Sequence, residues 1–195
     1  MRRRRPLRSR RWLGWLLVVS LGYGCVATRN FTAADTDAVD RLLGLIEERL
    51  EVAPDVARTK WNTKAPIEDL PREQQIIDGV GRRAPEFGLD PQVAAAFFRG
   101  QIEASKIVQN ALHSQWMATR QPSFATVADL GTDIRPVLDR LTPAMMRALA
   151  DALPVLQRPG GRQLLEKRTR AILVNAPGGE AAVRDAVGPL LKLSG

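Results

Sequence analysis

Apolar residues recur at helical spacing through almost the whole chain after residue 31. Val39, Leu42, Leu43, Ile46 and Leu50, for example, follow one another every three or four positions, which places them on one face of a helix. No segment alternates apolar and polar residues for long enough to indicate a sheet strand. Each amphipathic helix must bury its apolar stripe against another helix. The sequence therefore predicts an all-α fold, a bundle of helices.

Capping residues, prolines and glycines divide this pattern into separate helices. Asp35 or Thr36 can cap the first helix. Pro54 must kink or interrupt it, because proline lacks an amide hydrogen and crowds the preceding turn. Asp69 and Asp90, each followed closely by a proline, cap the next two long helices. Beyond Pro54, helices are expected near residues 56–61, 69–85, 91–119, 132–141, 143–157, 161–175 and 179–192, with a loop at 120–131.

The N-terminal segment has the three parts of a secretory signal peptide. Its first eleven residues, MRRRRPLRSRR, contain seven arginines and no acid, and the apolar run WLGWLLVVSLGYG and small residues follow. The apolar run is shorter than the roughly 20 residues that a membrane-spanning helix needs. We expect residues 1–27 to be a signal peptide, the mature protein to be periplasmic or secreted, and no stable membrane association after the leader is removed. A basic amphipathic anchor is the alternative.

Charge and cysteine content exclude several function classes. The whole chain has 29 basic and 21 acidic residues, but seven of the basic residues lie in the leader, so residues 28–195 carry 22 minus 21, or +1. A nucleic-acid-binding domain needs a basic face, so we expect no nucleic-acid partner. Cys25, the only cysteine, lies in the leader, where it could instead be a lipidated first residue. Together with a lone His113, this makes a His/Cys metal site improbable.

Polar side chains on otherwise apolar helical faces are the candidates for a site. Arg49 and Lys60 are eleven positions apart, about 20° past three full turns, so an unbroken helix places both on one stripe. Ser105 and Gln109 are four apart on the stripe of Ile102, and buried polar groups need hydrogen-bond partners. Taken alone, each pair is also compatible with a solvated helix face.

These positions, with the segment PIEDLPREQQ, carry a resemblance to a known family. The matching elements are Arg49 in EERLEVAPDVA, Lys60 in RTKW, the run DLPRE at 69–73, and Ser105 with Gln109 in GQIEASKIVQ. In order and approximate spacing they resemble the all-helical chorismate mutases, and the leader suggests the exported subclass. The resemblance implies a chorismate mutase-type helical bundle.

The resemblance also implies one domain at residues 28–195. Its catalytic core would span about residues 35–140, and additional C-terminal helices would occupy about 142–195. Exported relatives can carry a disulfide in the C-terminal part. This chain has no cysteine there, so packing alone must hold that segment. A homodimer is possible.

The activity implied by the resemblance is the cofactor-free rearrangement of chorismate to prephenate, an isomerase step of the shikimate pathway in aromatic amino acid biosynthesis. The family's catalytic roles fall on Arg49, Lys60 and Gln109, which hold a carboxylate and support the ether oxygen. An isochorismate pyruvate-lyase on the same fold and a non-catalytic helical binding protein are the alternatives.

The remaining substrate-binding positions also follow from the resemblance. Asp69 and Glu73 lie where the family binds the ring hydroxyl, Arg72 where it lines the pocket wall, and Ser105 where it binds a carboxylate. A last cation is expected from a later helix, with Arg135 as the candidate and Arg140 or Arg120 as alternatives.

Overall fold

A computed structural model describes residues 30–195, so the expected signal peptide and Cys25 lie outside the described residues. The described chain is helical and contains no strand, which confirms the all-α prediction. None of its helices is both long enough and apolar enough to cross a membrane. The elements are α1 Ala33–Thr63, α2 Leu70–Arg83, a 3-10 turn Ala84–Phe87, α3 Pro91–Ala118, a π-helical turn Leu130–Ile134, α4 Arg135–Leu156, α5 Gly161–Ile172 and α6 Gly179–Leu193.

Local capping chemistry sets the starts of α1, α2 and α3. Thr32 caps α1 through a capping box, in which its side chain accepts from the backbone of Asp35 and Asp35 accepts from the backbone of Thr32. The prediction of Asp35 or Thr36 as the cap was therefore off by three to four residues. Asp69 and Asp90 cap α2 and α3 as predicted, with a proline in the first turn of each helix.

Prolines do not end helices where the sequence pattern predicts. α1 runs without a break through Pro54, and α4 runs through Pro143, so the two short helices expected at 132–141 and 143–157 form one. Each proline removes one backbone hydrogen bond. On α4, Leu141, Met145 and Met146 form a buried face across the proline, and burying such side chains contributes roughly 1.5–3 kcal/mol each, which offsets that loss.

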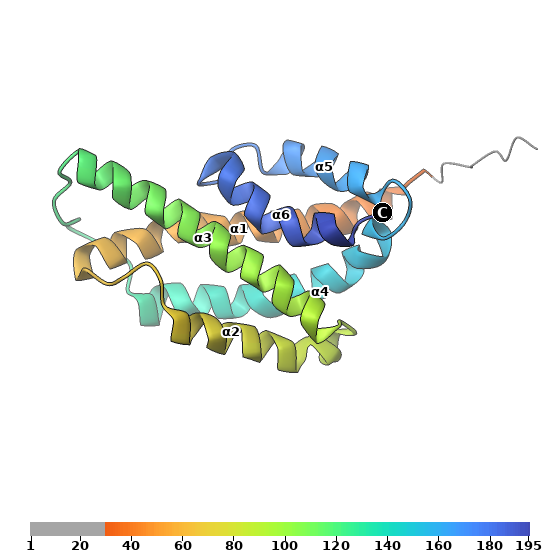
Figure 1. The fold of residues 1–195 in the computed structure, drawn as a ribbon, viewed down its shortest axis with the longest axis horizontal. Coiled ribbons are helices and arrows are strands. Elements are labelled where there is room, and N and C mark those ends of the chain that lie inside the picture. The colour runs from red at the N-terminus through yellow and green to blue at the C-terminus, as the bar shows by residue number, and fades with distance from the viewer. Residues whose placement is uncertain (1–29) are drawn as a thin grey trace, which may run out of the picture.

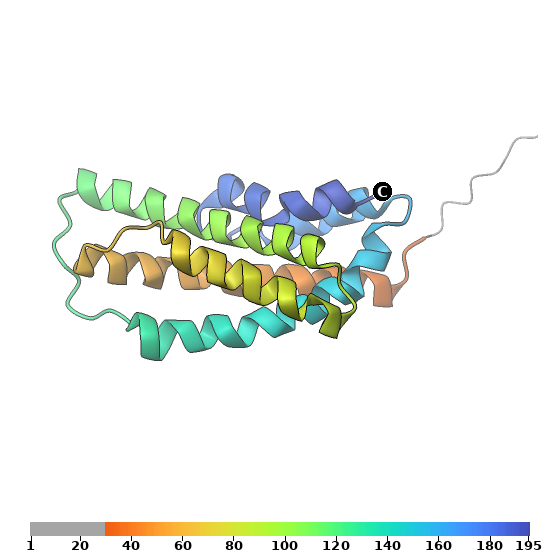
Figure 2. The same ribbon diagram turned by 60° about the horizontal axis from the view of Figure 1, so that its bottom comes forward.

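The helices lie side by side along one long axis (Figure 1). α1 and α3 pack against each other in the middle, while α4 packs on α1 and α2 packs on α3. α6 covers α3 and α5 covers α1, on the side of the α1–α3 pair away from α2 (Figures 1 and 2). The C-terminal segment is therefore part of the same bundle, although it matched the family pattern only in being helical.

A close backbone approach holds α6 on α3. At Gly100 an added Cβ would lie 2.6 Å from the backbone oxygen of Asp185, a distance that only glycine tolerates. The neighbouring Gln101 is 1 % exposed, and its amide donates to the backbone oxygen of Ala186 at 2.8 Å. The described residues contain no cysteine, so packing of this kind holds α6 on α3.

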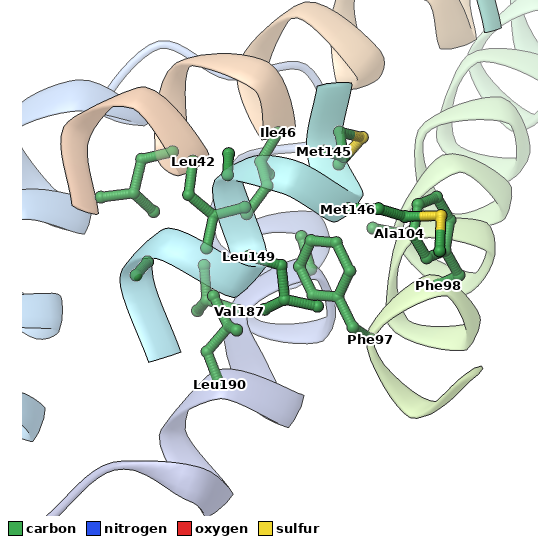
Figure 3. Packing of buried hydrophobic residues seen from close by; sticks show 14 of the residues in the cluster. Leu42, Ile46, Phe97, Phe98, Ala104, Met145, Met146, Leu149, Val187 and Leu190 are labelled. Atoms are coloured by element: carbon green, nitrogen blue, oxygen red, sulfur yellow. The ribbon is translucent and has the colours of Figure 1, made fainter. Parts of the chain in front are cut away.

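The apolar core joins side chains from all six α-helices of the described chain. Leu42 and Ile46 of α1 face Phe97 of α3, Leu149 of α4 and Leu190 of α6 (Figure 3). All five are completely buried.

Replacing Phe97 by alanine should lower the free energy of unfolding by about 3–5 kcal/mol, because the substitution removes a fully buried ring and leaves a cavity. Urea denaturation followed by circular dichroism measures this. Met117 on the same helix is 64 % exposed, so Met117→Ala should change stability by less than about 0.5 kcal/mol. Equal losses for the two variants would show that the core is placed wrongly.

Candidate active site

One cavity of about 160 Å³ lies between α1, α2, α3 and the start of α4. It has a polar lining and an apolar wall. All eight residues predicted for the site line it: Arg49, Lys60, Asp69, Arg72, Glu73, Ser105, Gln109 and Arg135. The wall consists largely of aliphatic side chains: Val52, Val56, Ile67, Ile76, Ile102, Leu130, Ile134 and Leu138.

Arg49 is a buried cation without a protein counter-ion among the described residues. Its side chain lies on α1, the residue is 8 % exposed, and its Nε has no hydrogen-bond partner. Burial lowers the pKa of the guanidinium to about 10, so it still carries its charge at neutral pH. An unpaired buried charge is costly. A bound anion in the cavity would compensate it.

Lys60 lies three turns further along α1 and faces the same cavity. Its ammonium donates to the backbone oxygen of Ile67 at 2.6 Å, which leaves two of its three N–H groups for a ligand. Burial lowers the pKa of Lys60, and the nearby carboxylates of Asp69 and Glu73 partly counter that effect. The continuity of α1 through Pro54 is what places Lys60 on the stripe of Arg49.

The start of α2 supplies the acidic side of the cavity. Asp69 accepts from the backbone of Arg72 at 3.2 Å and in turn donates its own backbone N–H to Glu73 Oε1 at 3.2 Å. Arg72 reaches toward α4, where its guanidinium lies 3.9 Å from the carboxylate of Asp139. The cap that begins α2 therefore also orients two carboxylates and a guanidinium on the cavity.

Ser105 and Gln109 meet on α3. Gln109 is 4 % exposed, and its amide nitrogen lies 3.2 Å from the backbone oxygen and 3.1 Å from the hydroxyl oxygen of Ser105. Its Oε1 has no partner within the described chain. The pair is a hydrogen-bonded unit whose hydroxyl hydrogen is free to bind an acceptor.

Arg135, the candidate for the later cation, is the first residue of α4. The π-helical turn before it is capped by Asp129, whose carboxylate accepts from the backbones of Gly131 and Thr132. Arg135 lines the cavity, whereas Arg120 and Arg140 do not. Arg140 instead pairs with Glu48 on the surface. Of the candidate and its two alternatives, only Arg135 therefore lies on the cavity.

Sequence reasoning missed two charged residues of the lining, Lys106 and Asp139. The available signal for Lys106 was its position three residues before Gln109, which places both on one face of α3. Its pairing with Glu103, three residues earlier, is typical of a surface ion pair. Asp139 had no local signal, because only the packing of α4 brings it to Arg72.

The lining carries five cationic and three anionic side chains. The cations are Arg49, Lys60, Arg72, Lys106 and Arg135, and the anions are Asp69, Glu73 and Asp139. Five minus three leaves a net charge of +2, which complements a small dianion. Ser105 has no histidine or carboxylate as a hydrogen-bond partner within residues 30–195, so the arrangement favours binding and electrostatic stabilisation over nucleophilic attack.

Comparison with known proteins agrees with this geometry. The family model for chorismate mutase type II matches residues 33–110. The secreted chorismate mutase of Mycolicibacterium smegmatis is 31 % identical over 147 residues, which cover 75 % of this chain and 81 % of the relative. The secreted chorismate mutase of Mycobacterium tuberculosis is 29 % identical, with coverage of 72 % and 71 %.

Solved structures extend the similarity to the C-terminal helices. The chorismate mutase of Burkholderia phymatum superposes with a TM-score of 0.75 at 30 % identity and covers 80 % of this chain and 98 % of its own. The chorismate mutase of Burkholderia thailandensis gives a TM-score of 0.73 at 36 % identity, with coverage of 78 % and 98 %. The similarity therefore reaches well beyond the family model's match.

Arg49→Met should raise the free energy of unfolding at pH 7, because it removes a charge that folding must desolvate. The fall of the Arg49 pKa from the ordinary arginine value to about 10 corresponds to a cost in folding free energy of about 3 kcal/mol. The substitution also removes packing contacts of the arginine side chain, so the expected gain in unfolding free energy is about 1–3 kcal/mol. The desolvation cost of Arg49 is fully present at any pH below its folded-state pKa. The gain in unfolding free energy from Arg49→Met should therefore be the same between pH 5 and 9.

Urea denaturation of both proteins measures this difference. Arg41→Met on the same helix is the matched control, since the Arg41 side chain is 61 % exposed and should contribute less than about 0.5 kcal/mol. A loss of stability in Arg49→Met larger than that of the control would contradict an uncompensated charge.

Proposed function

The chain belongs to the all-helical chorismate mutase family, and on that premise we propose that it is an exported chorismate mutase that rearranges chorismate to prephenate. The observation that carries the proposal is the buried, unpaired Arg49 in a cavity whose lining has a net charge of +2. Chorismate is a small dianion with two carboxylates, an ether oxygen and a ring hydroxyl. Each of these groups finds a complementary side chain in the cavity.

The reaction is a [3,3]-sigmatropic rearrangement in which the ether C–O bond breaks as a new C–C bond forms. No proton, electron or external group is transferred, so the protein needs no general base and no cofactor. As the C–O bond lengthens, negative charge grows on the ether oxygen. Donors placed at that oxygen bind the transition state more tightly than the ground state.

Lys60 and Gln109 are the proposed donors to the ether oxygen. Lys60 has two free N–H groups, one for a substrate carboxylate and one for the oxygen. Gln109 approaches from α3, where one of its amide hydrogens lies against the Ser105 hydroxyl oxygen. In the bound state the amide of Gln109 would donate to the ether oxygen. The two donors come from different helices and therefore act on opposite sides.

The arginines hold the substrate in its compact reactive shape. Arg49 and Arg135 grip the carboxylates from α1 and α4, while Arg72 supports them from α2 and is oriented by Asp139. Asp69 and Glu73 accept from the ring hydroxyl. Fixing both ends in this way removes rotational freedom before the reaction, which can contribute several kcal/mol of the barrier reduction.

The domain organisation and export form part of the proposal. Residues 1–27 would act as the signal peptide, and residues 28–195 would form a single domain with the core at about 35–140 and the extension at about 142–195. The relatives from two mycobacterial species are named as secreted. The described residues of a single chain supply five cationic side chains to the cavity.

The protein expressed from the full chain should consume chorismate, followed by loss of its ultraviolet absorbance, and should release prephenate. Lys60→Ala should lower kcat/KM by about 10²–10³-fold, the usual effect of removing one preorganised donor, with helicity unchanged. Lys64→Ala is the matched control, because Lys64 is exposed and lies outside the cavity. Absence of turnover in the folded wild type, or release of pyruvate in place of prephenate, would refute the proposed reaction.

Turnover should be nearly independent of pH between 5 and 8, because the amide of Gln109 donates without a proton to lose. At higher pH kcat/KM should fall as Lys60 loses its proton. Burial lowers the pKa of Lys60, so kcat/KM should begin to fall at a lower pH than the one at which an ordinary lysine loses its proton.

Gln109→Glu provides the comparison for the pH profile. A glutamate must be protonated to donate, so this variant should lose activity as pH rises through the titration of its carboxyl group. A steep fall of wild-type activity between pH 5 and 8 with the fold intact would contradict the role of Gln109.

A further inference from the structure

We propose that Lys106 is a positioning residue of the active site, which fixes the carboxylate of Glu73 for the hydroxyl end of the substrate. The inference rests on the proposed function and extends it to a residue that the family pattern does not supply. Lys106 lies on α3, one position after Ser105, and lines the cavity.

The ammonium of Lys106 joins three carboxylates from separate parts of the chain. It lies 2.8 Å from Glu103 on its own helix, 3.2 Å from Glu73 on α2 and 3.6 Å from Glu68 in the loop before α2. Its side chain is only 14 % exposed. Burial opposes the charged form, but Glu103 and Glu73 outweigh it and raise the pKa of Lys106. This residue is therefore a cross-link between α3 and the α1–α2 connection.

Glu73 is held at both of its oxygens as a result. Oε1 accepts from the backbone of Asp69 at 3.2 Å, and Oε2 accepts from Lys106 at 3.2 Å. The Glu73 side chain is only 19 % exposed, so water could not fully replace the hydrogen bond from Lys106 if that bond were lost. Glu68, Glu73 and Glu103 all lie around the Lys106 ammonium. Without that ammonium, the carboxylates of Glu68 and Glu103 would repel the carboxylate of Glu73. The expected response is rotation of Glu73 away from the cavity.

The position of Glu73 matters to the catalytic lysine as well as to the substrate. Glu73 and Asp69 are the carboxylates that favour the charged form of Lys60, whereas Lys106 itself disfavours it. Removing Lys106 therefore has two opposing effects on Lys60. The direct effect on Lys60 is favourable and the effect through Glu73 is unfavourable. Because Lys106 is also one of the five cations that line the cavity, only non-additivity with a Glu73 substitution identifies the route through Glu73.

Lys106→Met keeps the length of the side chain and removes its charge. We expect kcat/KM for chorismate to fall about tenfold, which corresponds to ~1.4 kcal/mol. Most of the change should appear in KM, because contacts to the ring hydroxyl serve ground state and transition state alike. Lys106→Arg should recover most of the loss. Arg99→Met, on the exposed side of the same helix and outside the cavity, should leave both constants unchanged.

A double-mutant cycle with Glu73→Gln tests the route of action. If Lys106 acts through Glu73, Lys106→Met should have less than about a twofold effect in the Glu73→Gln background, because coupled residues are non-additive. The full tenfold loss in that background would overturn the inference. So would wild-type kinetics in Lys106→Met.

A structural readout separates this inference from the proposed function. A crystal structure of Lys106→Met should show Glu73 Oε1 withdrawn from the backbone N–H of Asp69, while Arg99→Met should retain that contact. If the wild type fails to turn over chorismate, the proposed function is wrong, and an unmoved Glu73 in Lys106→Met would independently refute the positioning role.

Discussion

The burial of Arg49 is the interaction on which the active site depends. A guanidinium that is 8 % exposed, with its pKa lowered to about 10 and no counter-ion in the described chain, is an unfavourable feature of the folded state. The apolar core must supply the free energy that offsets it. A bound dianion, as we propose, would compensate this cost, because its carboxylate would provide the missing counter-charge. The same residue that costs stability therefore provides affinity.

In the bundle, the apolar core that stabilises the fold is separate from the polar cavity that contains the destabilising buried charge. α5 and α6 extend the apolar core over one part of the α1–α3 pair, where Gly100 permits backbone contact with α6. The cavity lies between α1, α2, α3 and the start of α4. A rigid packed scaffold next to the cavity keeps Lys60 and Gln109 at fixed positions, and a preorganised donor requires this.

Much of the site could be predicted because its residues stand at helical spacings. Arg49 with Lys60 and Ser105 with Gln109 share faces of single helices, so their proximity follows from local geometry once the helices form. Asp69 was identifiable as a cap from its neighbours. Lys106 was not identifiable, because its pairing with Glu103 has the spacing of a solvated surface pair. Its contact with Glu73 depends on how α2 packs on α3.

The sequence by itself determined the all-α class, most helix boundaries and the side chains that face inward, because helical periodicity and capping are local properties. The tertiary structure alone decided that α1 and α4 continue through Pro54 and Pro143, since the burial that offsets a lost backbone hydrogen bond comes from distant helices. It also decided which of the candidate arginines reach the cavity. The sequence favoured Arg135 over Arg140 and Arg120, and only the packing of α4 on α1 brings Arg135 to the lining.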